Sequence, residues 1–111
     1  MERRAYERLS AQLQARMFYG NIVYTGTVTN LSESGMFVTT RMNFPVDSMF
    51  IIVVFQNGQT FKIPVKVSRI SKANHHAGAE DTGIGVTLLN PPRDYLDFVG
   101  KCKASSASTH R

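Results

Sequence analysis

The sequence of 111 residues has few of the features that mark secreted, metal-binding or membrane-spanning chains. Its single cysteine, Cys102, excludes an intramolecular disulfide framework and a cysteine-rich zinc site. The longest apolar stretch, Met49 to Phe55, is far shorter than the roughly 20 residues that span a bilayer. Residues 1–10 hold no apolar run of the kind found in a signal peptide. We therefore expect a compact cytoplasmic domain with no membrane span.

Acidic residues are also few, since 8 Asp and Glu stand against 13 Lys and Arg, for a formal net charge of +5. A basic chain favours an anionic partner, such as nucleic acid, a membrane surface or a phosphorylated small molecule. The excess positive charge is distributed unevenly, with +1 on residues 1–8, +1 on residues 9–100 and +3 on residues 101–111. Because the body is nearly neutral, the positions of the charges matter more than their sum.

Alternation of apolar and polar residues predicts strands along most of the body. The expected strands are residues 12–19, 22–30, 36–40, 48–56, 61–68 and 83–89, of which the first is the weakest prediction. Residues 48–56 are apolar on both faces, which fits a central strand of a closed barrel. Asn57-Gly58 predicts a hairpin with a type I′ turn, because both central residues of that turn need positive φ. In the returning strand, Pro64 favours an edge or bulged position. The side chains of this strand that are expected to face inward are Phe61, Ile63, Val65 and Val67.

The spacing of apolar residues changes near the C-terminus. Asn90 is a good N-cap, Pro91 suits the first helical position, and the apolar residues that follow recur at helical spacing. This predicts a short helix over residues 91–99 that ends at Gly100. We expect three regions: a flexible Arg-rich arm (1–10), an all-β barrel with its terminal helix (11–100), and a disordered tail (101–111).

Residues that could carry catalysis are poorly placed. A catalytic acid–base pair needs an acid of raised pKa beside an ionised base. The spacing of the carboxylates does not suggest such a pair; the ones considered are Glu80, Asp81, Asp94 and Asp97. His75 and His76 point apart in an extended segment and have no further ligand at metal spacing. Cys102, between two lysines, is better interpreted as an inert exposed thiol than as a reactive one. The sequence predicts no enzyme, no metal and no resident cofactor.

Two polar clusters remain. Arg4 and Arg8 form an Arg-x-x-x-Arg pattern, with Arg3 just ahead of it. A guanidinium is a planar fork that can grip phosphate through two hydrogen bonds or pair with an edge of guanine. Alone, this pattern is more typical of a solvated basic terminus than of a binding site.

The second cluster is Asn30-Leu31-Ser32-Glu33-Ser34-Gly35, an Asn-x-Ser-x-x-Gly turn between two expected strands. Asparagine offers both a donor and an acceptor, and serine adds a hydroxyl. Glycine permits positive φ and the close approach of a ligand. Alone, this cluster is ordinary turn chemistry.

Together and in this order, the clusters resemble the motifs of a PilZ domain. Arg4-x-x-x-Arg8 is followed after 21 residues by Asn30-x-Ser32-x-x-Gly35, and later by Gly83-Ile84-Gly85-Val86 before a terminal helix. The resemblance covers residues 3–100. It implies that the protein is bacterial and folds as a six-stranded antiparallel Greek-key barrel. It also implies that this barrel binds cyclic di-GMP and signals to an effector protein.

The resemblance also implies a binding site made of Arg3, Arg4, Arg8, Asn30, Ser32 and Gly35. The two motif arginines would clamp the phosphates and guanines of the ligand, and Arg3 would be a third contact, associated with capture of a stacked pair of ligands. Asn30 and Ser32 would hydrogen-bond the ligand, and Gly35 would let the chain turn beneath it. Ordering of the arm on binding would change the surface offered to the effector.

Two alternatives stay open. A small barrel could bind RNA or single-stranded DNA through its basic ends and surface aromatic residues, although the near-neutral body argues against it. A PilZ-like adaptor could bind only protein, although the intact arginines argue against that. A homodimer is compatible with each of these functions.

Overall fold

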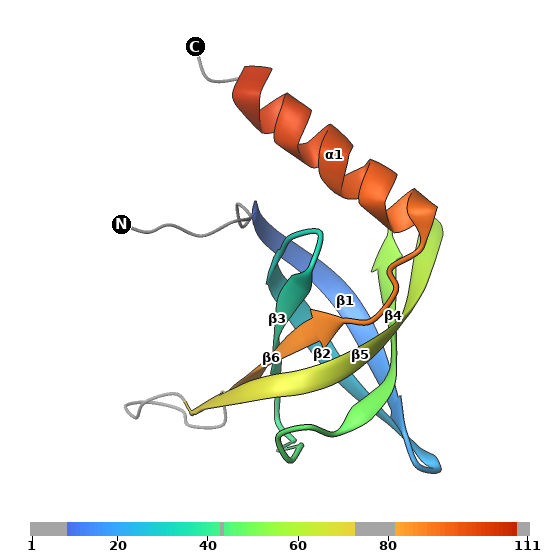
Figure 1. Ribbon diagram of the computed structural model, residues 1–111, viewed down its shortest axis with the longest axis vertical. Helices are drawn as coiled ribbons and strands as arrows, with labels where there is room; N and C mark the ends of the chain where they lie inside the picture. The colour runs from blue at the N-terminus through green and yellow to red at the C-terminus, as the bar shows by residue number, and fades with distance from the viewer. Residues whose placement is uncertain (1–8, 43, 73–81, 109–111) are drawn as a thin grey trace.

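Six antiparallel strands close into a barrel in the order β1-β2-β3-β6-β5-β4 (Figure 1). The protein is represented by a computed structural model that describes residues 9–42, 44–72 and 82–108. The elements are β1 (Leu9–Tyr19), β2 (Ile22–Leu31), β3 (Gly35–Thr40), β4 (Met49–Gln56), β5 (Gln59–Lys72), β6 (Thr82–Leu88) and α1 (Arg93–Ser108). The predicted fold class, a six-stranded antiparallel barrel with a C-terminal helix, is confirmed.

Local turn chemistry sets the pairing of β4 with β5. Asn57 and Gly58 have φ angles of 44° and 79°, so the predicted type I′ turn is present. Pro64 lies where the β6 ladder ends: its carbonyl accepts a hydrogen bond from the Leu89 N–H at 2.8 Å, and strand pairing starts one residue later. Proline has no N–H to donate, and at the end of the β5–β6 ladder no strand hydrogen bond is lost. This agrees with the edge-like position predicted for Pro64.

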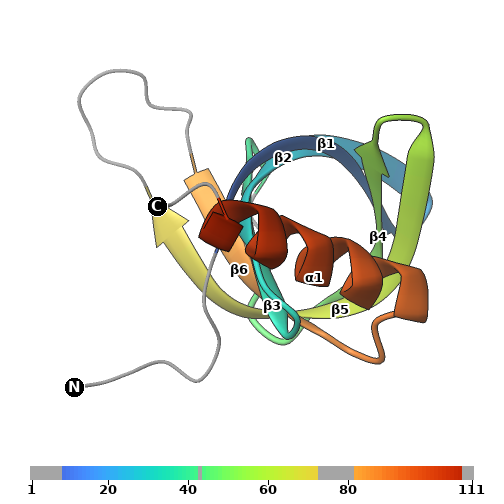
Figure 2. The ribbon, with the colours of Figure 1, turned by 90° about the horizontal axis from the view of Figure 1, so that it is seen from above.

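The core fills the barrel and extends to the helix above it. The four residues predicted to face inward on β5 (Phe61, Ile63, Val65 and Val67) are all buried. α1 lies across one open end (Figure 2) and buries Tyr95 and Val99 completely. The centre of the Phe61 ring lies 5.7 Å from that of Tyr95, in an edge-on arrangement. It lies 5.3 Å from the centre of the Phe98 ring, and these two rings are stacked. Burial of each large side chain contributes about 1.5–3 kcal/mol, which fixes the helix on the barrel.

The helix differs from the prediction at both ends. Asn90 is not its N-cap, because the residue has a φ of 77° and the first helical hydrogen bonds go to the Pro92 carbonyl. The helix also continues through Gly100 to Ser108, so the predictions of an end at residue 99 and of disorder over 101–108 are wrong. Beyond Gly100, Cys102 is half-buried and Lys103 pairs with Glu33, and this tertiary context outweighs the low helix propensity of glycine.

The prediction of a flexible arm is wrong for Leu9 and Ser10, because both residues belong to β1. Residues 1–8, 73–81 and 109–111 lie outside the part of the chain that the structure describes. Within the described part, no helix combines the length and the hydropathy needed to span a membrane.

Gly100 offers a direct test of the extended helix. A Cβ at this exposed position would meet nothing within 4 Å. Gly100→Ala should therefore stabilise the fold by about 1 kcal/mol, the propensity difference inside a helix, as measured by urea unfolding. Gly58→Ala is the opposite control, because a φ of 79° strains alanine and should lower the stability. A Gly100→Ala variant no more stable than wild type would contradict a helix that passes through residue 100.

Candidate functional site

A row of residues crosses the outer wall of the barrel at one level. Asn30 of β2 pairs with Phe37 of β3, Phe37 pairs with Gly85 of β6, and Gly85 pairs with Arg69 of β5. On the other side of Asn30, its register partner is Ser10 of β1. Directly paired residues of neighbouring strands share a face, so these side chains lie side by side on the wall.

Two register shifts turn Asn30 and Arg69 outward. Val28 pairs with Val38 and Asn30 with Phe37, so Thr29 is an extra residue between them. Ser68 is likewise extra between Val67 and Arg69. Because side chains alternate between the two faces, each position would point inward without its bulge. Instead Asn30 is half-buried and Arg69 is exposed.

The glycines of β6 give this wall its flat surface. The Phe37 ring occupies the space that a Cβ on Gly83 would need, and the Arg69 side chain lies over Gly85, with Nε 3.1 Å from where a Cβ would stand. The Arg69 guanidinium is 5.9 Å from the centre of the Phe37 ring. We call Asn30, Phe37, Gly83, Gly85 and Arg69 the β6 shelf; it presents an amide, an aromatic ring and a guanidinium together.

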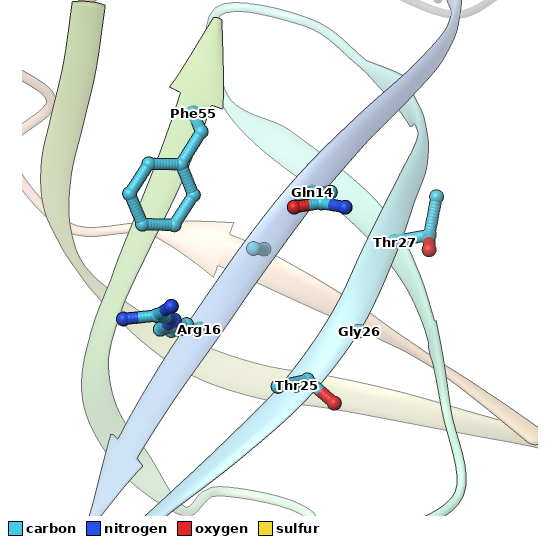
Figure 3. Close-up of a pocket in the computed structure, with 7 residues that line it drawn as sticks. Gln14, Arg16, Thr25, Gly26, Thr27 and Phe55 are labelled. Atoms are coloured by element: carbon cyan, nitrogen blue, oxygen red, sulfur yellow. The ribbon is translucent and has the colours of Figure 1, made fainter.

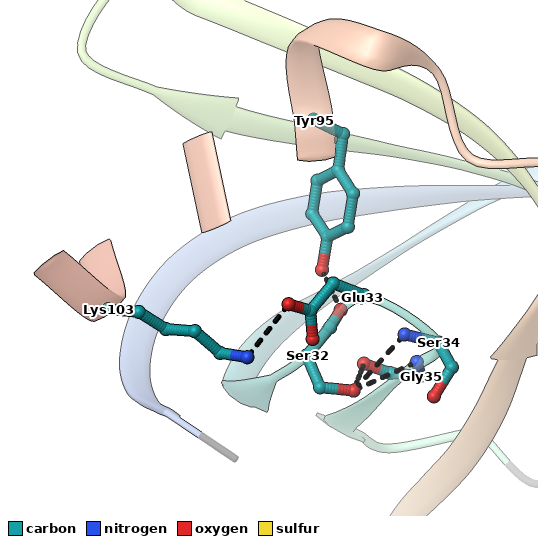
Figure 4. Close-up of polar contacts among 6 residues, drawn as sticks. All are labelled: Ser32, Glu33, Ser34, Gly35, Tyr95 and Lys103. Carbon is teal, nitrogen blue, oxygen red and sulfur yellow. Dashed lines mark hydrogen bonds and ion pairs between the residues drawn. The ribbon is translucent and has the colours of Figure 1, made fainter. Parts of the chain in front are cut away.

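The turn that follows Asn30 is held by Ser32 (Figure 4). The Ser32 hydroxyl accepts hydrogen bonds from the N–H groups of Ser34 and Gly35, both at 3.2 Å, and donates to the Gly35 carbonyl at 3.4 Å. A hydroxyl has one donor and two acceptor sites, so all three are in use. Ser32 is only 3% exposed. Its side chain therefore fixes the turn.

Gly35 has a different role from the one its motif suggests. Its φ is not in the positive range that glycine permits, so the turn does not use that freedom here. Gly35 is instead the first residue of β3, and a Cβ there would stand 3.0 Å from the Val86 carbonyl. Glycine avoids this tight contact with the β6 backbone.

Helix α1 holds the same turn at two points (Figure 4). The buried Tyr95 hydroxyl donates to the Ser32 carbonyl at 2.7 Å, and the Lys103 ammonium pairs with Glu33 Oε2 at 2.7 Å. The hydrogen bond from Lys103 lowers the pKa of Glu33 below its ordinary value. Burial, with the nearby Glu33 charge, raises the pKa of Tyr95, so its hydroxyl remains a donor at neutral pH. The helix thus restrains the turn that adjoins the β6 shelf.

The structure brings half of the predicted site together. Asn30, Ser32 and Gly35 lie in one segment at the edge of the β6 shelf, whereas Arg3, Arg4 and Arg8 lie outside the described residues. Sequence reasoning missed Arg69, because alternation along β5 gives no sign of a bulge at Ser68. The β6 glycines were the available signal, since they mark a wall that leaves room for large neighbouring side chains.

The residues considered for catalysis or metal binding lie in α1 or outside the described residues. Cys102 lies half-buried in α1, not in a tail, and burial raises the pKa of its thiol. His75, His76, Glu80 and Asp81 lie outside the described residues. Among the residues that the structure describes, no group of three or more His, Cys, Asp or Glu side chains could hold a metal ion.

Comparison with protein families decides the classification. The family described as the PilZ domain matches residues 2–100. This chain belongs to the PilZ domain family. Comparison with curated protein sequences gives no match.

Several solved structures share the fold. The Bacillus subtilis inhibitor of motility MotI/DgrA superposes with a TM-score of 0.80 at 14% identity, over 100% of this chain and 55% of that one. The PilZ domain of Escherichia coli YcgR with c-di-GMP gives 0.75 at 17% identity, over 99% of this chain and 100% of the other. A longer YcgR chain in complex with c-di-GMP gives 0.78 at 18% identity, over 97% of this chain and 47% of that one. The chain thus spans about half the length of MotI and of the longer YcgR chain.

The hydrogen bond from Tyr95 can be tested by removing one atom. Tyr95→Phe keeps the ring and leaves the Ser32 carbonyl without its buried donor, so the free energy of unfolding should fall by about 1–3 kcal/mol. Tyr24→Phe, which also removes a hydroxyl from a partly buried ring, is the control and should change stability by less than about 0.5 kcal/mol. Equal urea midpoints for the two variants would contradict the assigned role of Tyr95.

The Glu33 to Lys103 pair predicts a pH dependence. The folded pKa of Glu33 is lowered, so the stability it contributes is present above the unfolded pKa of about 4.3 and is lost as pH falls through the folded value. Both side chains are about a third exposed, so the contribution should be below about 1 kcal/mol. Unfolding of wild type and Glu33→Gln should differ at pH 7, and the difference should disappear as the pH falls through the lowered folded pKa of Glu33. A difference that stays constant across this range would exclude the ion pair as its cause.

Proposed function

We propose that this PilZ protein is a receptor for cyclic di-GMP, which binds on the β6 shelf and undergoes no chemistry there. One observation carries the proposal. The arginine motif and the Asn30–Gly35 motif are both intact, and the second adjoins a wall that already presents Arg69 and Phe37. The YcgR structures named with c-di-GMP have the same fold and support this choice of ligand.

The β6 shelf has the groups that such a ligand needs. A cyclic dinucleotide offers two phosphates, two planar bases and guanine edges that both donate and accept. The Arg69 side chain lies over Gly85, and its guanidinium provides a cationic surface on which a guanine could stack. Asn30, turned outward by the bulge at Thr29, provides an amide for a base edge.

In the proposed complex, Arg4 and Arg8 grip the phosphates and guanines, and Arg3 contacts a second, stacked ligand molecule. The connectivity of the chain supports this assignment. β1 begins at Leu9, directly after Arg8, and its second residue, Ser10, is the register partner of Asn30. The basic motif therefore leads into the strand that borders the β6 shelf.

Ser32 and Gly35 complete the proposed site in supporting roles. The Ser32 hydroxyl could bond the ligand only by giving up one of its three bonds within the turn, so we assign it to holding Asn30 and the turn in place. Gly35 allows β3 to approach β6 closely, which keeps Phe37 on the β6 shelf. Arg3, Arg4, Arg8 and Asn30 remain as the proposed direct contacts, joined by Arg69.

The proposed output is a change of surface, read by an effector protein. Segments that order on binding alter what a domain presents, and an arm that closes over the β6 shelf would do so without any catalytic step. As a receptor for an intracellular messenger, the protein would act in the cytoplasm.

Titration calorimetry with cyclic di-GMP tests the proposal. We expect binding by the wild type, and affinity reduced roughly tenfold or more by each of Arg4→Ala, Arg8→Ala and Arg69→Ala, because each removes a charged planar group from the site. Arg93→Ala, an exposed arginine at the start of α1, is the matched control and should bind as wild type does. Absence of heat with wild type at tens of micromolar ligand would refute the proposal.

One observation would favour the nucleic-acid alternative. A salt-dependent gel shift with single-stranded RNA that persisted in the Arg4→Ala and Arg8→Ala variants would indicate binding through the rest of the basic surface.

A further inference from the structure

The outward face of β4 is apolar although the barrel does not require it. Phe50, Ile52 and Val54 point inward and are buried. The alternate residues Met49, Ile51, Val53 and Phe55 therefore point outward, and Met49 is 61% exposed. A strand that faces water on one side is expected to carry polar residues there. The barrel core explains only one of the two apolar faces of β4.

The apolar surface continues onto the neighbouring strands. Ile51 pairs with Phe18 of β1, and Phe18 pairs with Val23 of β2, so the three lie in one row. Phe18 is 42% exposed and Val23 is 50% exposed. We call Met49, Ile51, Val53, Phe55, Phe18 and Val23 the β4 patch. It lies opposite the β6 shelf, because the closed strand order puts β1 and β4 across the barrel from β3 and β6.

The border of the β4 patch is positively charged. By register, Arg16 and Lys62 lie on either side of Val53, and Lys66 pairs with Met49. The six strands contain five Lys and Arg residues and no Asp or Glu. An acid near this border is Asp47, whose carboxylate is 3.8 Å from the Lys66 ammonium.

A shallow depression of about 360 Å³ adjoins the β4 patch and contains Arg16 (Figure 3). Arg16 and Phe55 project from neighbouring strands toward the same side, with the guanidinium 5.4 Å from the centre of the ring. Its other polar side chains are those of Gln14, Thr25 and Thr27. The depression thus combines a cation, an aromatic ring and hydrogen-bonding groups at the edge of an apolar surface.

We propose that the β4 patch is the docking surface for a partner protein whose apolar contact centre is bordered by carboxylates, one of which enters the depression beside Arg16. Protein interfaces combine an apolar centre with a polar rim, and arginine and aromatic residues dominate their binding energy. The positive border selects a negative partner, because complementary charge steers association and excludes like-charged surfaces.

Two other occupants fit the β4 patch less well. A second copy docked through the same patch would bring two positively charged borders together, each with Arg16 and Lys62, and no strand carries an acid to pair them. A membrane surface would need apolar side chains that reach about 5–10 Å below the lipid headgroups, whereas Ile51, Val53 and Phe55 are half-buried on the barrel wall. The partner protein therefore fits the β4 patch best.

Selection from a displayed library of short random peptides tests the chemistry of the partner directly. Peptides selected on the wild type should combine Asp or Glu with Leu, Phe or Trp. Their affinity should fall roughly tenfold or more on Arg16→Glu and on Phe18→Ser. Arg93→Glu, an exposed arginine outside the β4 patch, should bind them as wild type does. In amide spectra of the wild type, the selected peptides should shift residues of β1 and β4.

Failure of this proposal is distinguishable from failure of the proposed receptor function, because Arg16→Glu and Phe18→Ser should still unfold cooperatively on heating and should leave cyclic di-GMP binding unchanged. Selected peptides that lack acidic residues, or that bind both variants as tightly as wild type, would overturn the proposal. So would a selection that yields no binder. Self-association abolished by Phe18→Ser, or sedimentation with anionic phospholipid vesicles abolished by Arg16→Glu, would reassign the β4 patch to a second copy or to a membrane.

Discussion

Two β-bulges decide which side chains reach the outer wall of this barrel. Each inserts one residue into a strand, Thr29 in β2 and Ser68 in β5, and so reverses the alternation of the residues that follow. Asn30 and Arg69 are thereby placed outward in one row, with Phe37 lying across Gly83 between them. The proposed binding surface depends on both bulges, because an unbroken alternation would point both polar groups into the core.

The helix links that surface to the stability of the domain. α1 buries Tyr95 in the mouth of the barrel, and the same residue donates to the backbone of the turn that follows Asn30. The Ser32 hydroxyl then holds the turn from within. A motif that the resemblance assigns to ligand contact therefore also has a structural purpose: one of its members, Ser32, has no hydrogen-bonding capacity to spare in this conformation.

The parts of the fold that depend on local sequence signals were predicted well. The parts that depend on contacts between distant segments were not. The strand pattern, the Asn57-Gly58 turn and the inward residues of β5 followed from alternation and turn chemistry. The bulges did not, because an extra residue is visible only through its partner strand. The length of α1 was also missed, since Gly100 predicts a helix end and only packing by neighbours such as Cys102 and Lys103 carries the helix past it. Asn30, Ser32 and Gly35 were found from their motif, whereas Arg69 required the register of β5 against β6.

The central claim is that cyclic di-GMP binds on the β6 shelf. Titration of isotope-labelled protein with cyclic di-GMP, followed by backbone amide chemical shifts, tests it most directly. The account predicts that the largest changes fall on Asn30, Phe37, Gly85 and Arg69, with little change on the outward residues of β4. Changes confined to β1 and β4, or no changes at saturating ligand, would contradict it.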